Sequence, residues 1–353
     1  MSNELLLVGS VPMDTVQDVF QTFGARLGKF LPAMPDGEVG PRRHWISRVH
    51  YHVLALHPDL EVVQQPAKDD DGREHIAPRN AGDSWMFRVK EGVDQIRFGE
   101  PGWRLGYAHE AVNSYFVFTT LREKGLVPPG LRFQVSMPMV NSVLPPRLFP
   151  NVSDREKVIP GYTEALRAEV ETIVEKIPND DLAIQWDCST ELQDAYGSIP
   201  GFPAETAIAR NVGQIEAICP HIPENVALGF HMCFGTLGGW SRFQPDDIGG
   251  AVDMANAFVA HARRPVNWVH IPLLNSLEES FYAPLARLDP QGARVFLGVI
   301  HNMDTLEQRL ALARRFVDDF GLAAYCGFGR VPPPELPKIL TDHLKAAGVQ
   351  DDA

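Results

Sequence analysis

The sequence predicts a parallel α/β fold, specifically a (β/α)8 TIM barrel with inserted loops in the N-terminal half of the chain. Short apolar runs alternate with helix-like segments along the whole sequence, as in βα units. Most of these runs are continuous, which is typical of parallel strands covered on both faces. A doubly wound open sheet is the alternative, but no Gly-x-Gly-x-x-Gly motif follows the first predicted strand. Such barrels take about 250 residues, so we expect one domain over residues 1–353, with room for insertions.

The apolar runs place all the strands of this barrel except the second. The predicted strands are Leu5–Val11, Leu131–Met139, Ala183–Ser189, Val226–Cys233, Val266–Leu273, Val295–Ile300 and Ala323–Gly329. The second strand is expected between His44 and Phe98, where the pattern is least regular. Within that region residues 66–84 are dense in charge, Gly and Pro, which favours an exposed loop.

Helices are predicted between these strands. Ser153–Ile177 carries its apolar residues on one stripe, and Pro160 is expected to separate its beginning from the longer helix that follows. Asp304–Phe320 opens with an Asp/Thr cap signal and ends before a glycine. Val252–Arg264 is a further predicted helix.

The composition narrows the class of protein. A net charge of -13 argues against a nucleic-acid partner. No apolar run approaches the roughly 20 residues that span a bilayer, and the first residues lack the basic segment of a signal peptide. The 4 cysteines are widely spaced and predict no disulfide framework. We therefore expect a cytoplasmic protein with reduced thiols and no membrane partner. The sequence is compatible with a homo-oligomer and does not decide the oligomeric state.

Polar side chains gather at the predicted carboxyl ends of the strands, where barrel enzymes carry their catalytic groups. His231 and Cys233 are two positions apart, so both side chains point to the same face of one strand. Imidazole and thiolate are also the ligands that zinc favours. Taken singly, a histidine or cysteine here is more often a packed core residue. However, the next three predicted strands end at His270, His301 and Cys326, and this grouping of histidines and cysteines favours a metal site.

Five passages in chain order are similar to motifs of one known family. They are "LLVGSVP", "ALRAEVETIVEKIPNDDLAIQWDCSTEL", "GFHMCFG", "VFLGVIHNMDTLEQ" and "AAYCGFGR". Together they resemble the catalytic domain of cobalamin-independent methionine synthase. That family belongs to the barrel superfamily that also holds uroporphyrinogen decarboxylase and the coenzyme M methyltransferases.

The resemblance implies a zinc site at which His231, Cys233 and Cys326 are ligands. In methionine synthases the fourth ligand is a glutamate at the end of the following strand, but here that strand reads "VNWVHIPLLN" and has His270 in its place. We therefore include His270 in the metal site. It is either a fourth ligand or a residue that holds one of the other three through a hydrogen bond.

The resemblance also implies roles for residues that contact the substrates. His301 matches a histidine thought to supply a proton, and Ser10, which follows Gly9, matches the residue that holds an amino-acid carboxylate. Asp187 matches the first acid of an Asp-Glu-Pro motif that helps bind the substrate amine. The second acid and the proline are replaced here by Cys188 and Ser189. This departure puts homocysteine in doubt as the substrate.

The turn-rich segment Pro32–Ile46 is a candidate substrate loop, because it follows the first strand–helix unit and is dense in charge. Its charged residues include Asp36, Glu38, Arg42 and Arg43. The arginines could hold a carboxylate or phosphate with two parallel hydrogen bonds. The alternative is a solvated loop whose arginines pair with its own acids.

These observations favour a zinc-dependent methyl- or alkyltransferase. In this hypothesis a thiol acceptor is held as a zinc thiolate and attacks an activated donor. The donor is a methylated folate, a methylated corrinoid or another alkyl compound such as an epoxide. The chain lacks the duplicated N-terminal barrel of full-length methionine synthases, which favours a donor other than polyglutamyl folate. A metal-free decarboxylase or lyase of the uroporphyrinogen decarboxylase type and a non-catalytic metal-binding protein are the alternatives.

Overall fold

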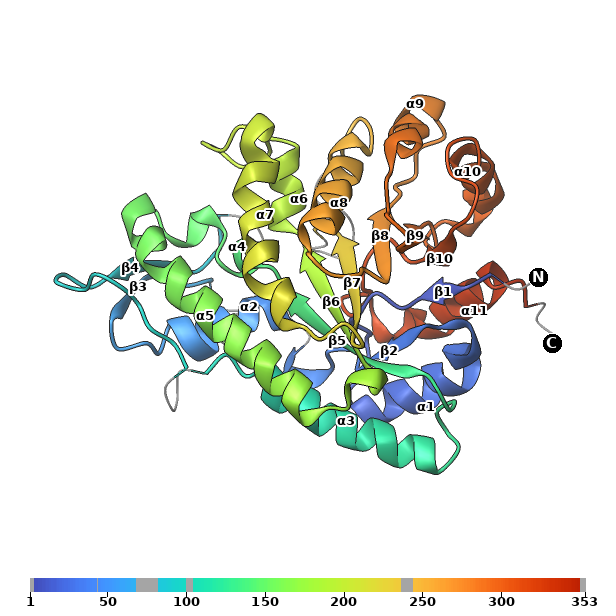
Figure 1. Ribbon diagram of the computed structural model, residues 1–353, viewed down its shortest axis with the longest axis horizontal. Helices are drawn as coiled ribbons and strands as arrows, with labels where there is room; N and C mark the ends of the chain where they lie inside the picture. Colours follow the sequence, from blue (N-terminus) through green and yellow to red (C-terminus); the bar gives the residue numbers. More distant parts are fainter. Residues whose placement is uncertain (1–2, 43, 68–81, 100–103, 236–243, 350–353) are drawn as a thin grey trace.

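A computed structural model describes residues 3–42, 44–67, 82–99, 104–235 and 244–349. Its centre is a sheet of eight parallel strands that curls into a nearly closed barrel surrounded by helices (Figure 1). This confirms the predicted fold class. The strands are β1 (Leu5–Leu6), β2 (Ala33–Pro35), β5 (Arg132–Pro138), β6 (Leu182–Cys188), β7 (Ala227–Met232), β8 (Trp268–Pro272), β9 (Arg294–Gly298) and β10 (Gly321–Ala323).

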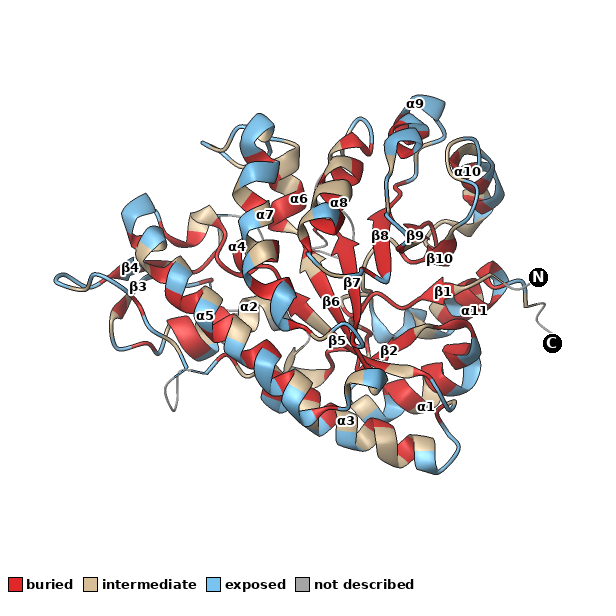
Figure 2. Ribbon diagram, viewed as in Figure 1, coloured by how far each residue is buried: buried red, intermediate tan, exposed pale blue. Residues whose placement is uncertain are grey.

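The strands pair in the order β1-β10-β9-β8-β7-β6-β5-β2, so β1 and β2 are the two ends of the hydrogen-bonded order. The strands are buried, and the helices turn their exposed faces outward (Figure 2). The α-helices are α1 (Val16–Leu27), α2 (Trp45–Val49), α3 (Tyr107–Glu123), α4 (Val140–Val143), α5 (Val152–Lys176), α6 (Thr190–Ala195), α7 (Ala207–Ile218), α8 (Gly249–His261), α9 (Glu279–Tyr282), α10 (Leu306–Ala313) and α11 (Leu336–Ala346). Among the described residues, every helix is too short or too polar to cross a membrane.

The prediction for the second barrel strand was wrong. This strand is β2, which precedes the region between His44 and Phe98. It has only 3 residues and begins directly after Pro32, so its sequence pattern resembles a turn. The region from His44 to Phe98 instead contributes α2 and a separate antiparallel pair, β3 (Leu60–Gln64) with β4 (Met86–Val89), which lies outside the barrel (Figure 1). Most of the charged loop at residues 66–84 lies outside the described residues.

The last barrel strand also differs from its prediction, because β10 ends at Ala323 and the residues that follow form a loop. The amide of Phe328 in that loop donates to the carbonyl of Ser10, at 2.9 Å. The apolar run therefore continues past the strand because it packs against the segment after β1. Cys326 lies on this loop and not on a strand.

Helix α5 runs without interruption through Pro160, so the predicted break is wrong. The carbonyl of Lys157, one turn before the proline, accepts a hydrogen bond from the amide of Ile96, at 3.0 Å. A neighbouring segment thus supplies a donor where the proline disturbs the helical ladder. Helix α10 is shorter than predicted, since turns at Phe316 and Val317 bond back to Ala313.

The barrel interior is filled in layers. One cluster of buried residues in the sheet combines six aliphatic and two aromatic side chains: Leu6, Val8, Ala33, Ala183, Ala227, Trp268, Phe296 and Ala323. Above them the amides of Gln134 and Gln185 both donate to the carbonyl of Val8, at 3.0 and 2.6 Å. These bonds reach across the barrel to the segment after the short strand β1. The next layer, at the carboxyl ends of the strands, holds the titratable residues.

The passage of Ile96 over α5 leads to a prediction about two helical glycines. A Cβ atom at Gly161 would lie 2.0 Å from the carbonyl oxygen of Ile96, whereas one at Gly213 in α7 would meet nothing within 4 Å. We expect Gly161→Ala to destabilise the protein by about 1–3 kcal/mol, as overpacking does. Gly213→Ala should stabilise it by up to about 1 kcal/mol. Denaturant unfolding of the two variants checks both signs, and a stabilising Gly161→Ala would contradict the close approach.

Candidate metal centre

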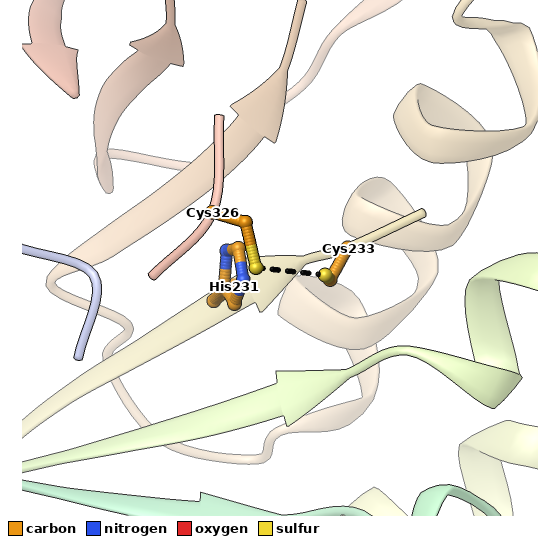
Figure 3. A group of neighbouring side chains, drawn as sticks. All are labelled: His231, Cys233 and Cys326. Carbon is orange, nitrogen blue, oxygen red and sulfur yellow. Dashed lines mark hydrogen bonds between the residues drawn. The ribbon is translucent and has the colours of Figure 1, made fainter. Parts of the chain in front are cut away.

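Two strand ends that are distant in sequence bring one histidine and two cysteines together. His231 is the penultimate residue of β7, Cys233 follows that strand, and Cys326 lies on the loop after β10. One potential ligand atom from each lies within 4.8 Å of the others. The sulfur atoms of Cys233 and Cys326 are 3.2 Å apart (Figure 3). The amide of Cys233 still bonds to the carbonyl of Cys188 on β6, which keeps its side chain on the same face as His231.

The ring of His231 is almost fully buried and is held from one side. Its Nδ1 atom lies 2.7 Å from Nδ1 of His270, whose Nε2 atom lies 2.9 Å from the carbonyl oxygen of Ala324. The other nitrogen of His231, Nε2, is buried and has no hydrogen-bond partner. A buried nitrogen in that state is costly unless it meets an ion or a ligand. Two sulfur atoms and one imidazole nitrogen are the donor set that suits zinc, so these residues fit the ion that the sequence predicts.

The pKa shifts of the residues in this centre indicate that a bound cation would be favourable. The hydrogen bond between Cys233 and Cys326, together with burial, raises the pKa of Cys233 well above its usual value. Burial lowers the pKa of His231, but Cys326 and Asp187 raise it more, so its net shift is upward. Both upward shifts arise from neighbouring groups that become negative, and burial adds to the shift of Cys233 only. A divalent cation would oppose them and keep the thiols ionised.

Two acids complete the same end of the barrel. Asp187 on β6 is the register partner of His231, and it accepts a hydrogen bond from Gln185, at 2.9 Å. Burial raises the pKa of Asp187 to about 7, although His231 and Gln185 act in the opposite direction. Burial, followed by the charges of Asp187 and Asp36, raises the pKa of Glu38 well above its usual value. Two buried carboxyl groups so close together favour a cationic partner.

The loop after β2 is built to hold Glu38 in this place. Asp36 accepts hydrogen bonds from the amide of Glu38 at 2.9 Å, from Arg42 at 2.8 Å and from the hydroxyl of Ser114 at 2.7 Å. Glu38 has a φ of 50°, which is uncommon outside glycine and marks backbone strain. Its Oε1 atom is buried without a hydrogen-bond partner. A Cβ atom at Gly9 would lie 2.8 Å from this oxygen, so Gly9 makes room for Glu38.

The remaining residues predicted for the substrate loop and its neighbours form internal contacts. Arg42 pairs with Asp36 and approaches Glu110 at 3.6 Å. The arginine is thus bound to its own loop, but in a largely buried setting rather than a solvated one. The hydroxyl of Ser10 accepts a hydrogen bond from the amide of Gly329, at 3.3 Å, on the loop of Cys326. Arg43 lies outside the described residues.

His301 follows β9 and is oriented by a buried arginine. Nη1 of Arg309 donates to Nε2 of His301, at 3.0 Å, so the ring proton of a neutral His301 lies on Nδ1. Burial and the charge of Arg309 lower the pKa of His301 to about 3. The ring is therefore neutral at physiological pH, and its Nδ1 proton is available for donation without a positive charge on the ring.

Sequence analysis missed several residues that shape the site. Arg309 shares the buried stripe of α10 with Leu306 and Leu310, and an arginine on an apolar stripe was the available signal. Gln185 lies two residues before Asp187 and so faces the same side of β6. A cavity borders Glu38 and is lined by both polar and apolar groups, among them Asp36, Arg42, Arg48, His52, Tyr107, Glu110, Phe133 and Ser136.

Comparisons with known proteins find a related fold. No protein-family model and no curated protein matches the sequence. The structure of a B12-independent methionine synthase from Shewanella sp. W3-18-1, in complex with selenomethionine, superimposes with a TM-score of 0.60. The two are 13% identical, and the match covers 98% of this chain and 97% of the other. A structure of TcOYE with pHBA covers 97% of this chain and 94% of its own at 11% identity, with a TM-score of 0.31, which is too low to indicate a shared fold. The first likeness shows that this chain and a methionine synthase have the same fold.

The burial of Glu38 leads to a prediction about stability. We expect Glu38→Gln to raise the melting temperature, because it removes a carboxylate that is buried beside Asp187 and Asp36 while Arg42 and Ser136 only partly compensate. When the pKa of a carboxyl group is higher in the folded than in the unfolded state, the protein becomes less stable as the pH rises above the unfolded-state pKa, which is about 4.3 for a glutamate. The gain should therefore be absent near pH 4 and grow toward pH 8.

Thermal melts of Glu38→Gln and the parent protein across this pH range test the prediction. Glu123→Gln, at an exposed position on α3, is the matched control and should leave the melting temperature nearly unchanged at every pH. A Glu38→Gln variant that is less stable than the parent at pH 8 would show that the carboxylate is compensated in the folded protein.

Proposed function

We propose that this protein is a zinc-dependent methyl- or alkyltransferase whose acceptor is a small thiol. The observation that carries the proposal is the convergence of His231, Cys233 and Cys326, with a buried His231 nitrogen that has no hydrogen-bond partner. The fold shared with a B12-independent methionine synthase supports the same conclusion. The resemblance of five sequence passages to that family supports it independently of the coordinates.

His231, Cys233 and Cys326 would hold the zinc ion and leave one coordination position open, as catalytic zinc sites do. Zinc bound there would lower the pKa of an entering thiol so that it reacts as a thiolate near neutral pH. The amide of Gly235 donates to the sulfur of Cys233, at 3.3 Å, and thus favours the ionised form of this cysteine. His231 and Cys233 are buried and Cys326 is half-buried, which would limit the access of water to the reacting sulfur.

Asp187 and Glu38 would bind a cationic group on one of the two substrates. Glu38 is buried and Asp187 is half-buried, and burial is the main cause of the raised pKa of each, which His231 and Arg42 only partly oppose. An ammonium group placed between them would be bound by charge-assisted hydrogen bonds. Because Cys188 stands where methionine synthases have their second acid, Glu38 would be the second carboxylate of this pair.

His301 would act on the donor side as a neutral hydrogen-bond donor. Arg309 fixes its ring so that Nδ1 carries the proton, and the same arginine disfavours a charged ring. A cavity beside His301 and Cys326, which Tyr325, Phe328 and Ile339 also line, offers space for the donor next to the reacting sulfur. The role of His301 would be to stabilise negative charge on the leaving group rather than to deliver a proton from an imidazolium.

Metal content separates this function from a metal-free lyase. We expect the purified protein to hold one equivalent of zinc, and His231→Ala or Cys326→Ser to lose it, because each removes one of three ligands. Cys219→Ser is the control, since that buried thiol follows α7 and lies outside the group. Elemental analysis of the four proteins measures this directly. Full activity in zinc-free protein would rule out the proposed chemistry and favour a lyase.

The acid pair predicts which thiols are good acceptors. Metal-replete protein should transfer alkyl groups to thiols in a screen against methylcobalamin, methylfolate and epoxide donors. We expect Asp187→Asn to raise KM about 10–100-fold for a thiol that carries an amine, since a hydrogen bond to a charged group is worth about 1.5–3 kcal/mol. The matched thiol with a hydroxyl in place of the amine should be unaffected. Zinc binding without transfer to any thiol would instead indicate a non-catalytic metal-binding protein.

A further inference from the structure

His270 stands where methionine synthases have a glutamate ligand, and both of its ring nitrogens are engaged in hydrogen bonds. Its ring is fully buried on β8. Nε2 lies 2.9 Å from the carbonyl oxygen of Ala324, and Nδ1 lies 2.7 Å from Nδ1 of His231. The three residues belong to three different strands or strand ends, so the chain of hydrogen bonds crosses β7, β8 and the segment after β10.

The hydrogen-bond partners of His270 indicate where the protons in this chain of hydrogen bonds lie. A carbonyl oxygen only accepts, so Nε2 of His270 carries a proton. The same ring therefore has one nitrogen on the Ala324 carbonyl and the other on His231, and a neutral imidazole that donates through Nε2 has only Nδ1 left to accept. Its Nδ1 is therefore an acceptor, and Nδ1 of His231 must donate to it. In a neutral His231 this leaves the lone pair on Nε2, the nitrogen that makes no hydrogen bond in the structure.

The space around His270 is shaped for this orientation. A Cβ atom at Gly298 on β9 would lie 2.8 Å from Nε2 of His270, so only glycine at this position admits the ring. His270 and His231 are register partners on adjacent parallel strands, which sets the distance between their rings. A rotation that turned a nitrogen of His270 toward the two sulfurs would break both hydrogen bonds of a fully buried ring.

We propose that His270 is a positioning residue rather than a fourth metal ligand. It links the carbonyl of Ala324 to Nδ1 of His231 by hydrogen bonds, and this relay turns Nε2 of His231 toward the two cysteines. The functional role of this relay rests on the proposed metal site, but its hydrogen bonds are present in the metal-free protein. Histidine ligands in metal sites are commonly oriented through their second nitrogen in this way. Here the orienting group is a second histidine, anchored by a backbone carbonyl.

The first test measures the tautomers without any metal. Long-range proton–nitrogen NMR correlation on metal-free protein labelled with 15N-histidine reports which nitrogen of each ring carries the proton. We expect the Nδ1–H tautomer for His231 and the Nε2–H tautomer for His270, with the signals assigned by His270→Gln. An Nε2–H tautomer for His231 would overturn the proposal. This test decides the relay even if the protein binds no zinc, in which case the proposed function fails separately.

The second test counts the ligands of the zinc-loaded protein by X-ray absorption. We expect two sulfur ligands and a single imidazole, and a second imidazole would overturn the proposal. His270→Leu should keep both sulfur ligands and one equivalent of zinc, while its affinity for zinc falls about 10–100-fold in competition with a chelator. His270→Gln, whose amide both donates and accepts, should restore part of the loss. An unchanged affinity in His270→Leu would also overturn the relay.

A matched control separates positioning from a general loss of packing. His50 is likewise a buried histidine with a carbonyl partner, since its Nε2 lies 2.7 Å from the oxygen of Val143, but it lies outside the metal group. His50→Leu should lose stability without weakening zinc binding. If His270→Leu does not fold, the tautomers and the ligand count of the parent protein still decide the proposal.

Discussion

The parallel register of three neighbouring strands is the constraint on which the rest of the site depends. Asp187 on β6 pairs with His231 on β7, and His231 pairs with His270 on β8. Register partners in a parallel sheet lie side by side and face the same way, so an acid and two imidazoles form one row across the barrel interior. A shift of any of these strands by one residue would turn its side chain to the outer face. Strand pairing alone therefore brings these three side chains together, without any contribution from the loops.

Two loops then add a cysteine and a second acid to this row of side chains, and the position of the acid costs stability. Cys326 comes from the loop after β10, which is anchored on Ser10, and Glu38 comes from the loop after β2, which is organised by Asp36. Glu38 combines an uncommon backbone conformation with a buried, unpartnered carboxyl oxygen. Such features persist where the surrounding structure forces them, and they gather at functional sites. Their presence at the mouth of a barrel is consistent with a site shaped for a ligand rather than for the stability of the fold.

Sequence predicted the row but not how its members contact each other. Apolar runs located the longer strands, and the two-residue period placed His231 and Cys233 on one face. The short β2 escaped detection because hydrophobic periodicity needs more residues than it has. The orientation of His270 depends on the absent side chain of Gly298 and on a carbonyl after β10, both distant in sequence. The inward position of Glu38 depends on a backbone angle, which no spacing rule describes.

The exchange of a glutamate for His270 changes the charge of the centre as well as its geometry. A divalent cation held by two thiolates and a neutral imidazole has no net charge, whereas a carboxylate ligand would make the same group negative. In this protein the acids at this end of the barrel are Asp187 and Glu38, which do not belong to the group of potential ligands. A neutral metal centre beside two acids would attract a substrate that carries its own cation without repelling an entering thiolate. Under the proposed function, the residues at this end of the barrel would thus divide into one set for the metal and another for the substrate.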